Sequence, residues 1–122
     1  MRSAFPKLNL SKSLYTKGLQ CKKALWLKKY NPEILTPPSP QLQAVFETGN
    51  EVGALACDLF PGGKKIPFKG TSFKEKISLT QKWLDEGVQT IYEATFSFDD
   101  ILVMVDILHQ NENGSFEIYE VK

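Results

Sequence analysis

Three side chains near the end of the chain have types and a spacing that could bind a divalent cation. Asp106 interrupts the apolar run from Ile101 to Leu108, and Glu120 and Lys122 lie two positions apart on an expected final strand. Because side chains alternate between the faces of a strand, Glu120 and Lys122 share a face. Mg²⁺ or Mn²⁺ would accept the carboxylates and activate a water for phosphodiester hydrolysis, while the lysine orients that water or neutralises transition-state charge.

Whether Asp106 joins Glu120 depends on the register of the hairpin between their strands. A two-residue turn at Asn113-Gly114 would place Asp106 opposite Val121, whereas a three-residue loop with a left-handed glycine bulge would place it opposite Glu120. We predict the bulged register, which brings two carboxylates and an ammonium onto one face. The alternative for these residues is a solvent-facing salt bridge between Asp106 and Lys122, with Glu120 uninvolved.

A basic helical arm is expected over residues 1–32. Asn9 or Ser11 could cap a first helix that ends at Gly18, and a second helix would run from about Gln20 to Tyr30. The arm carries eight basic side chains and no acidic one, whereas residues 33–122 carry seven basic and fourteen acidic, which gives the net charge of +1. This asymmetry favours a polyanionic partner such as nucleic acid or an anionic membrane, with a solvated lysine-rich surface as the alternative.

Two further helices and three strands complete the expected fold. Apolar spacing predicts a helix over 41–60, in which Gly49 and Gly53 allow close approach of another element or mark a break. A capping box from Ser72 to Glu75 begins a helix over 72–86, whose apolar face would be formed by Phe73, Ile77, Trp83 and Leu84. A short strand is expected near 65–68. β-rich segments at 90–98, 101–109 and 116–122 then predict a β-meander over 90–122.

Together these elements predict a single α+β domain of residues 1–122, with N-terminal helices packed on a three-stranded antiparallel meander. The charged fraction of 24% and the lack of any apolar run near ~18 residues exclude a disordered tail and a membrane span. No apolar segment follows the basic N-terminus, so no secretory signal is expected. The two cysteines, 36 positions apart, form no disulfide framework, which favours reduced thiols and a cytoplasmic location.

Three segments, in this order, resemble the β-meander of PD-(D/E)XK nucleases of the RecB-like branch: Tyr92-Glu93-Ala94-Thr95-Phe96, Val105-Asp106-Ile107-Leu108 and Ile118-Tyr119-Glu120-Val121-Lys122. The opening Leu10-Ser11-Lys12-Ser13, the downstream Cys21 and the helix at Gly49–Gly53 are similar to the front part of RecB-like exonucleases. The resemblance implies an incomplete restriction-endonuclease-like core that hydrolyses DNA. In it, Asp106 and Glu120 would bind Mg²⁺ or Mn²⁺, and Lys122 would be the catalytic lysine.

Other residues take secondary roles in this interpretation. Glu51 and Glu93 are further acidic candidates, with ordinary surface charge as the alternative for both. We expect the lysines of the arm to contact DNA phosphates, which would make binding salt-dependent; they are Lys12, Lys17, Lys22, Lys23, Lys28 and Lys29.

The sequence also departs from the family pattern. Gly53 stands where many RecB-like enzymes have a histidine, and His109 is expected to be exposed near a turn rather than a ligand. Some relatives bind an iron–sulfur cluster, for which Cys21 could be a ligand only in a longer parent, because the chain has no three further cysteines. Within this chain Cys21 is expected to be a free thiol and Cys57 a small core residue.

The family core continues beyond the lysine strand, so we expect the chain to be the N-terminal part of a larger enzyme. Such a piece would keep an open sheet edge capable of self-association and would have weak or absent catalysis. The alternatives are a non-catalytic nucleic-acid-binding module with a nuclease-like fold, and a basic interaction module that binds a partner protein or an anionic membrane.

Overall fold

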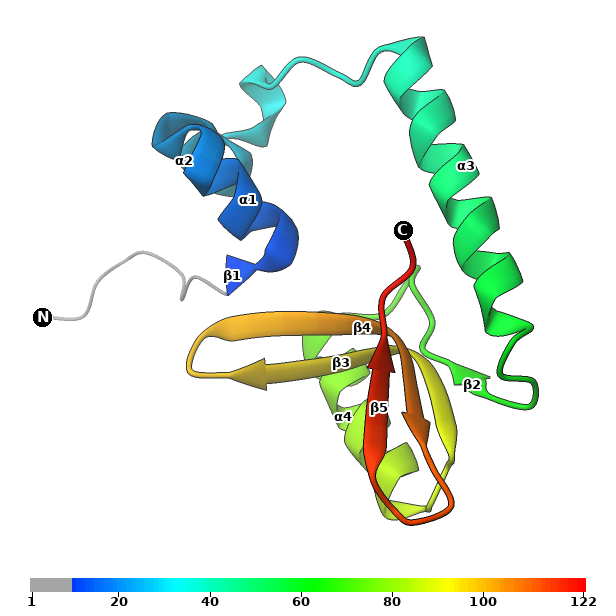
Figure 1. The fold of residues 1–122 in the computed structure, drawn as a ribbon. Coiled ribbons are helices and arrows are strands. Elements are labelled where there is room, and N and C mark those ends of the chain that lie inside the picture. Colours follow the sequence, from blue (N-terminus) through cyan, green and yellow to red (C-terminus); the bar gives the residue numbers. More distant parts are fainter. Residues whose placement is uncertain (1–9) are drawn as a thin grey trace, which may run out of the picture. The chain divides into compact units, whose positions relative to one another are not determined.

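A computed structural model describes residues 10–122, which divide into two compact units (Figure 1). The first unit contains residues 10–38 and Ser97–Val103, and the second contains Ser39–Phe96 and Met104–Lys122. The chain is α+β, as the sequence predicts, with helices α1 to α4 and a mixed sheet among the described residues. None of these helices combines the length and apolar character needed to cross a membrane.

The first unit holds β1 (Leu10–Ser11), α1 (Lys12–Gln20), α2 (Lys22–Tyr30) and the short 3-10 helix η1 (Pro32–Ile34). Ser11 caps α1, because its Oγ accepts a hydrogen bond from the Leu14 amide at 3.3 Å. Asn9, the other expected cap, lies outside the described residues.

The expectation that Gly18 ends the first helix is wrong, because α1 continues to Gln20. A Cβ at Gly18 would lie 2.8 Å from Leu25 Cδ2 of α2. The glycine therefore serves the close packing of two helices rather than the termination of one.

The second unit contains the longer helices and most of the sheet. Its elements are α3 (Pro40–Cys57), β2 (Lys64–Lys65), α4 (Phe73–Asp85), β5 (Phe116–Tyr119) and most of β3 (Thr90–Phe98) and β4 (Ile101–Gln110). The turn between β3 and β4 is at Asp99 and Asp100, as expected, and both have positive φ, 50° and 63°.

The sheet is larger than the expected three-stranded antiparallel meander and is mixed. Its order is β1-β4-β3-β2, and β5 also pairs with β4. β1 pairs in parallel with the start of β4 and β2 in parallel with β3, while β4 and β5 are antiparallel. The short strand expected near 65–68 overlaps β2 only at Lys65, and β1 was not expected. Both strands have two residues and pair with distant parts of the chain.

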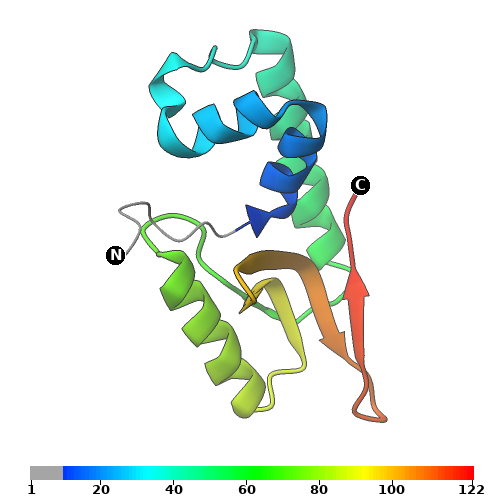
Figure 2. The same ribbon diagram turned by 90° about the vertical axis from the view of Figure 1, so that its left-hand side faces the viewer.

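The hydrophobic core of the second unit lies between the sheet and α4 (Figure 2). Its buried members are Ile66, Ile91, Ala94, Val105 and Leu108, and Leu79, Trp83 and Leu84 of α4 pack against them. The expected capping box is present: Glu75 N donates to Ser72 Oγ, and Ser72 N donates to Glu75 Oε2.

The predicted apolar face of α4 is partly wrong. Phe73 is 47% exposed, whereas Lys76 and Thr80 are the buried residues of the helix. Thr80 can be buried because its hydroxyl donates to Lys76 O at 2.8 Å and accepts from Thr95 N at 3.0 Å. This second hydrogen bond joins α4 to β3.

The expectation that Gly49 and Gly53 of α3 allow close approach of another element or mark a break is also wrong. A Cβ at Gly49 or at Gly53 would meet nothing within 4 Å, and the helix is unbroken. Ser39 caps it, accepting from Leu42 N, and apolar side chains such as Val45 and Leu55 are exposed. The apolar spacing therefore predicted the helix correctly but not its surroundings.

Replacing Thr80 with valine should lower the free energy of unfolding by about 1–3 kcal/mol, because the buried Thr95 N–H would lose its acceptor. The measurement is urea unfolding followed by circular dichroism. Thr48→Val is the matched control, since the Thr48 hydroxyl also bonds four residues back, to Ala44 O, but is exposed. Equal losses in the two variants would contradict a structural role for the α4–β3 hydrogen bond.

Candidate functional site

The predicted register of the final hairpin is confirmed. Gly114 has a φ of +87°, its N–H donates to Asn111 O, and Asn111 N donates to Ser115 O, each at 2.9 Å. The strands pair Gln110 with Phe116 and continue to Ile107 with Tyr119. The same register, continued one step beyond the last pair, would match Asp106 with Glu120.

Strand β5 ends at Tyr119, earlier than the predicted end at Lys122. The reason lies in Asp106, whose Oδ2 accepts a hydrogen bond from Val121 N at 2.8 Å. In a continued ladder the Val121 amide would face the backbone of Val105, the next register partner. The Asp106 carboxylate takes this donor instead, and the bond fixes the orientation of the half-buried aspartate.

Glu93 occupies an unusual backbone position on β3, the neighbour of β4. Its φ is +61°, in the left-handed region that non-glycine residues rarely adopt. Such a conformation costs on the order of 1–3 kcal/mol and is found most often at functional sites. The residues on either side, Tyr92 and Ala94, are buried, so the strained backbone of Glu93 lies in a well-packed part of the strand.

The charges around Glu93 link it to the predicted site. Burial raises the pKa of Glu93 most, and the negative charge of Asp106 raises it further. Lys65 and Lys76 act in the opposite direction, and Glu120 adds a smaller upward contribution to the pKa. Asp106 on β4 and Glu120, just after β5, therefore both act on the carboxyl group of Glu93 on β3.

Sequence reasoning missed Lys65 and Lys76. Lys76 is 5% exposed, and its Nζ lies 4.6 Å from the ring centroid of Phe68 and 5.3 Å from that of Phe73. The contact with two aromatic rings compensates part of the cost of burying an ammonium group. The aromatic residues near Lys76 were visible in the sequence, but helix periodicity assigned Phe73 to the core instead.

The hydroxyl of Tyr92 holds the loop after α3 against β3, next to Glu93. It donates toward the carbonyls of Cys57, at 3.2 Å, and Phe60, and it accepts from Gly63 N at 3.2 Å. A Cβ at Gly63 would lie 2.5 Å from the Tyr92 ring, so this contact requires glycine. Burial raises the pKa of the Cys57 thiol, which lies in the field of Glu93 and Asp106.

The remaining predicted residues lie outside this cluster of charges. Lys122 is exposed after the end of β5, and Glu51 is exposed on α3; neither is among the groups that shift the pKa of Glu93. Cys21 is an exposed free thiol and Cys57 a half-buried one. Asp106 and Glu120 act on the pKa of Glu93, whereas Lys122 does not.

His109 is not exposed as expected. It is half-buried, its Nδ1 lies 2.8 Å from Thr90 Oγ1, and its ring centroid is 5.0 Å from that of Phe60. Packing of the α3 loop on the sheet accounts for the difference.

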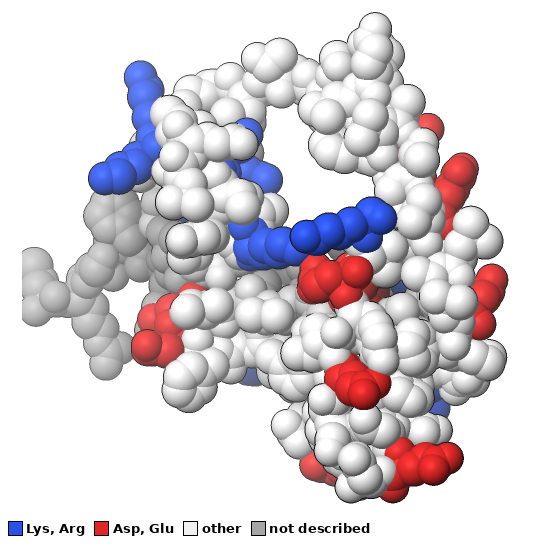
Figure 3. Space-filling view, viewed as in Figure 1, with Lys and Arg blue, Asp and Glu red and all other residues white. Residues whose placement is uncertain are grey.

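The lysines of the basic arm lie on α1 and α2. Lys12, Lys22, Lys23 and Lys28 are exposed, and Lys17 and Lys29 are half-buried. On the face shown in Figure 3, several blue lysine side chains project from the surface of the first unit, and red carboxylates are scattered over the surface of the second.

The donor set suits a hard cation. Mg²⁺ and Mn²⁺ take carboxylate oxygens and keep several waters, so two or three acidic side chains are enough. Within residues 10–122, no three histidine, cysteine or acidic groups are close enough to form a complete metal site by themselves. Asp106 still offers Oδ1, which has no hydrogen bond among the described residues, and a cation here would offset the negative charge that raises the pKa of Glu93.

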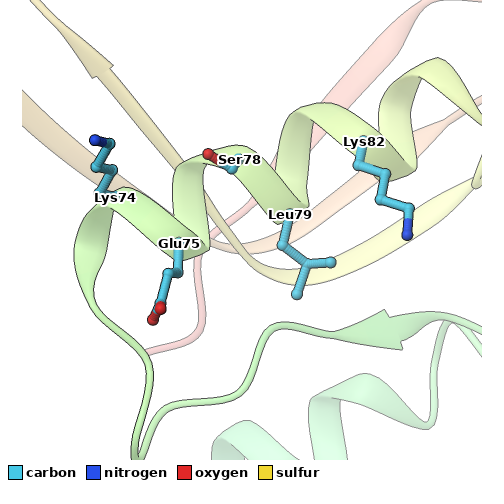
Figure 4. Close-up of a pocket in the computed structure, with 5 residues that line it drawn as sticks. All are labelled: Lys74, Glu75, Ser78, Leu79 and Lys82. Carbon is cyan, nitrogen blue, oxygen red and sulfur yellow. The ribbon is translucent and has the colours of Figure 1, made fainter.

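A shallow hollow on α4 is separate from these carboxylates. Its volume is about 380 Å³, and Figure 4 shows its lining side chains, all from α4: Lys74, Glu75, Ser78, Leu79 and Lys82. None of the predicted site residues contributes to it.

Comparisons with protein-family models, with curated proteins and with solved structures gave no significant match.

Replacing Glu93 with glutamine should stabilise the protein at neutral pH. Because the folded state raises the pKa of Glu93, it binds this proton more tightly than the unfolded state does. Stability is therefore lost as pH rises from the ordinary glutamate pKa through the raised value, and the variant should not show this loss. Urea unfolding across the acidic to neutral range measures the difference.

The control for this prediction is Glu51→Gln, an exposed glutamate on α3. It should follow wild type at every pH. A Glu93→Gln protein that is no more stable than wild type at neutral pH would contradict the raised pKa of Glu93.

Proposed function

We propose that Asp106, Glu120 and Glu93 bind Mg²⁺ or Mn²⁺ and that this chain carries the metal centre of a DNA-cleaving nuclease of the PD-(D/E)XK type. The supporting observation is the hairpin register, which pairs Ile107 with Tyr119, the neighbours of Asp106 and Glu120, while both of these carboxylates raise the pKa of Glu93 on the next strand. A cation bound among the three would offset the negative charge that acts on Glu93. The restriction-endonuclease-like core is part of this proposal.

Each residue has a distinct role in the proposed reaction. The bound cation would supply an activated water and stabilise charge on the phosphate. Asp106 is oriented by the Val121 amide, so its Oδ1 can face the cation without further rearrangement. Glu93, whose pKa is raised by burial and by Asp106, would hold the cation together with Asp106 and Glu120.

Lysines provide the positive charge that a phosphodiester requires. Lys122, two residues after Glu120, is the proposed catalytic lysine that orients the water. Lys65 and Lys76 already offset the charge of Glu93, and the same groups attract a phosphate. The lysines of α1 and α2 would hold the DNA backbone.

A non-catalytic nucleic-acid-binding module is the second candidate. The observation in its favour is that α1 and α2 carry basic side chains and no acidic ones, which is sufficient for phosphate binding without any reaction. The free thiols of Cys21 and Cys57 support a cytoplasmic location for either function.

Metal binding can be tested separately from catalysis with Asp106→Asn. Asparagine keeps an oxygen for the Val121 amide but loses the charge, so the fold should persist while cation binding weakens. Mn²⁺ at about 100 times its Kd should stabilise wild type by about 2.7 kcal/mol, and the variant by much less. Thermal unfolding with and without Mn²⁺ measures this, with Asp85→Asn as the matched control.

Cleavage of labelled DNA in Mn²⁺ tests the reaction itself. Asp106→Asn should lower the rate by about 100-fold or more, the loss typical of removing one electrostatic stabiliser. Asp85→Asn should retain the wild-type rate. Equal cleavage by wild type and Asp106→Asn would refute the metal centre, and Mn²⁺ binding by wild type without any cleavage would favour the non-catalytic module.

A further inference from the structure

Helix α2 presents an aromatic pair flanked by lysines, in which Trp26 is exposed and Tyr30 is half-buried. Trp26 is 52% exposed, and its ring centroid lies 5.4 Å from that of Tyr30, at an interplanar angle of 45°. Lys22, Leu25 and Lys29 join these two rings around a hollow of about 180 Å³. All five residues belong to one helix, so the surface is defined within the first unit alone.

The helical spacing explains why these side chains share a face. Relative to Trp26, Lys22 is four residues earlier, and Lys29 and Tyr30 are three and four residues later. Side chains three and four apart are neighbours on a helix surface. An indole with a wide exposed surface therefore lies between two ammonium groups.

Charge and shape together define the ligand that fits. α1 and α2 contain no acidic residue, so nothing on these helices competes with an anion for the lysines. The indole requires a planar partner, and stacking of a nucleobase on an aromatic side chain supplies ~1–3 kcal/mol. A polyanion with accessible planar groups matches both requirements.

Duplex DNA satisfies only one of these requirements, because its bases are stacked inside the helix and present edges rather than faces. A single strand offers backbone phosphates to the lysines and an unpaired base to the indole. We propose that the α2 surface formed by Lys22, Leu25, Trp26, Lys29 and Tyr30 binds single-stranded DNA, with a base stacked on Trp26. This deepens the nuclease proposal, on which it rests for the identity of the nucleic acid.

The test measures binding without cleavage, using the full chain with Asp106→Asn in the presence of chelator. The probes are a labelled oligothymidylate and an abasic strand of the same length, read by fluorescence anisotropy. Trp26→Ala should weaken oligothymidylate binding by about 5- to 150-fold and leave binding of the abasic strand unchanged. Phe116→Ala, which removes another aromatic side chain that is 52% exposed, should change neither.

Two more variants separate stacking from charge and from misfolding. Lys29→Gln should weaken binding of both strands and lower the slope of log affinity against log salt by about 0.7. Trp26→Phe should keep most of the affinity for oligothymidylate, because phenylalanine also stacks. A Trp26→Phe protein as weak as Trp26→Ala would overturn the stacking role.

Three other results would overturn the proposal. Wild type could bind the two strands equally, could bind a duplex of the same length more tightly, or could bind anionic phosphatidylserine vesicles more tightly than oligothymidylate at matched salt.

The outcomes for the two proposals are distinguishable. Trp26-dependent binding without Mn²⁺-dependent cleavage supports the α2 surface and refutes the nuclease. Asp106-dependent cleavage with no effect of Trp26→Ala on binding supports the nuclease and refutes the α2 surface.

Discussion

The register of the β4–β5 hairpin is the constraint on which the candidate site depends. It is set by Gly114, whose positive φ allows a three-residue loop closed by the Asn111 and Ser115 backbone. A shift of one residue would exchange the faces of every side chain on β5. Asp106 would then lie opposite Val121 instead of Glu120, and the two carboxylates would no longer converge.

Within this register, the backbone and the charge of Glu93 both lower the local stability of the site. Glu93 has a strained backbone and a carboxylate whose pKa is raised by burial and by Asp106. The surrounding structure compensates for both, since Tyr92 is tied to three backbone groups and Ala94 is fully buried. A rigid strand therefore holds the carboxylate of Glu93 in position despite its strained backbone and raised pKa.

The lysines of the chain serve two physical purposes. Those on α1 and α2 are mostly exposed and act as a diffuse charge, which suits phosphates without selecting a sequence. Lys76 is buried between α4 and two phenylalanine rings, where its charge acts on a specific carboxylate. The first kind is recognised from composition, whereas the second is recognised only from packing.

The sequence by itself determined the local structure of this protein. The capping box of α4, the Ser11 cap, the bounds of β3 and the hairpin register all follow from residues within a few positions of one another, where backbone hydrogen bonding and glycine conformation decide the outcome. The register that would match Asp106 with Glu120 was predictable for this reason.

Only the tertiary structure decided what depends on distant residues. The strands β1 and β2, the packing role of Gly18, the burial of Lys76 and the field around Glu93 arise from contacts between segments far apart in the chain. Periodicity identifies an apolar or polar stripe, but the partner that covers it, or leaves it exposed as on α3, is fixed by packing. Burial and electrostatic coupling are properties of that packing, so no local pattern in the sequence could specify them.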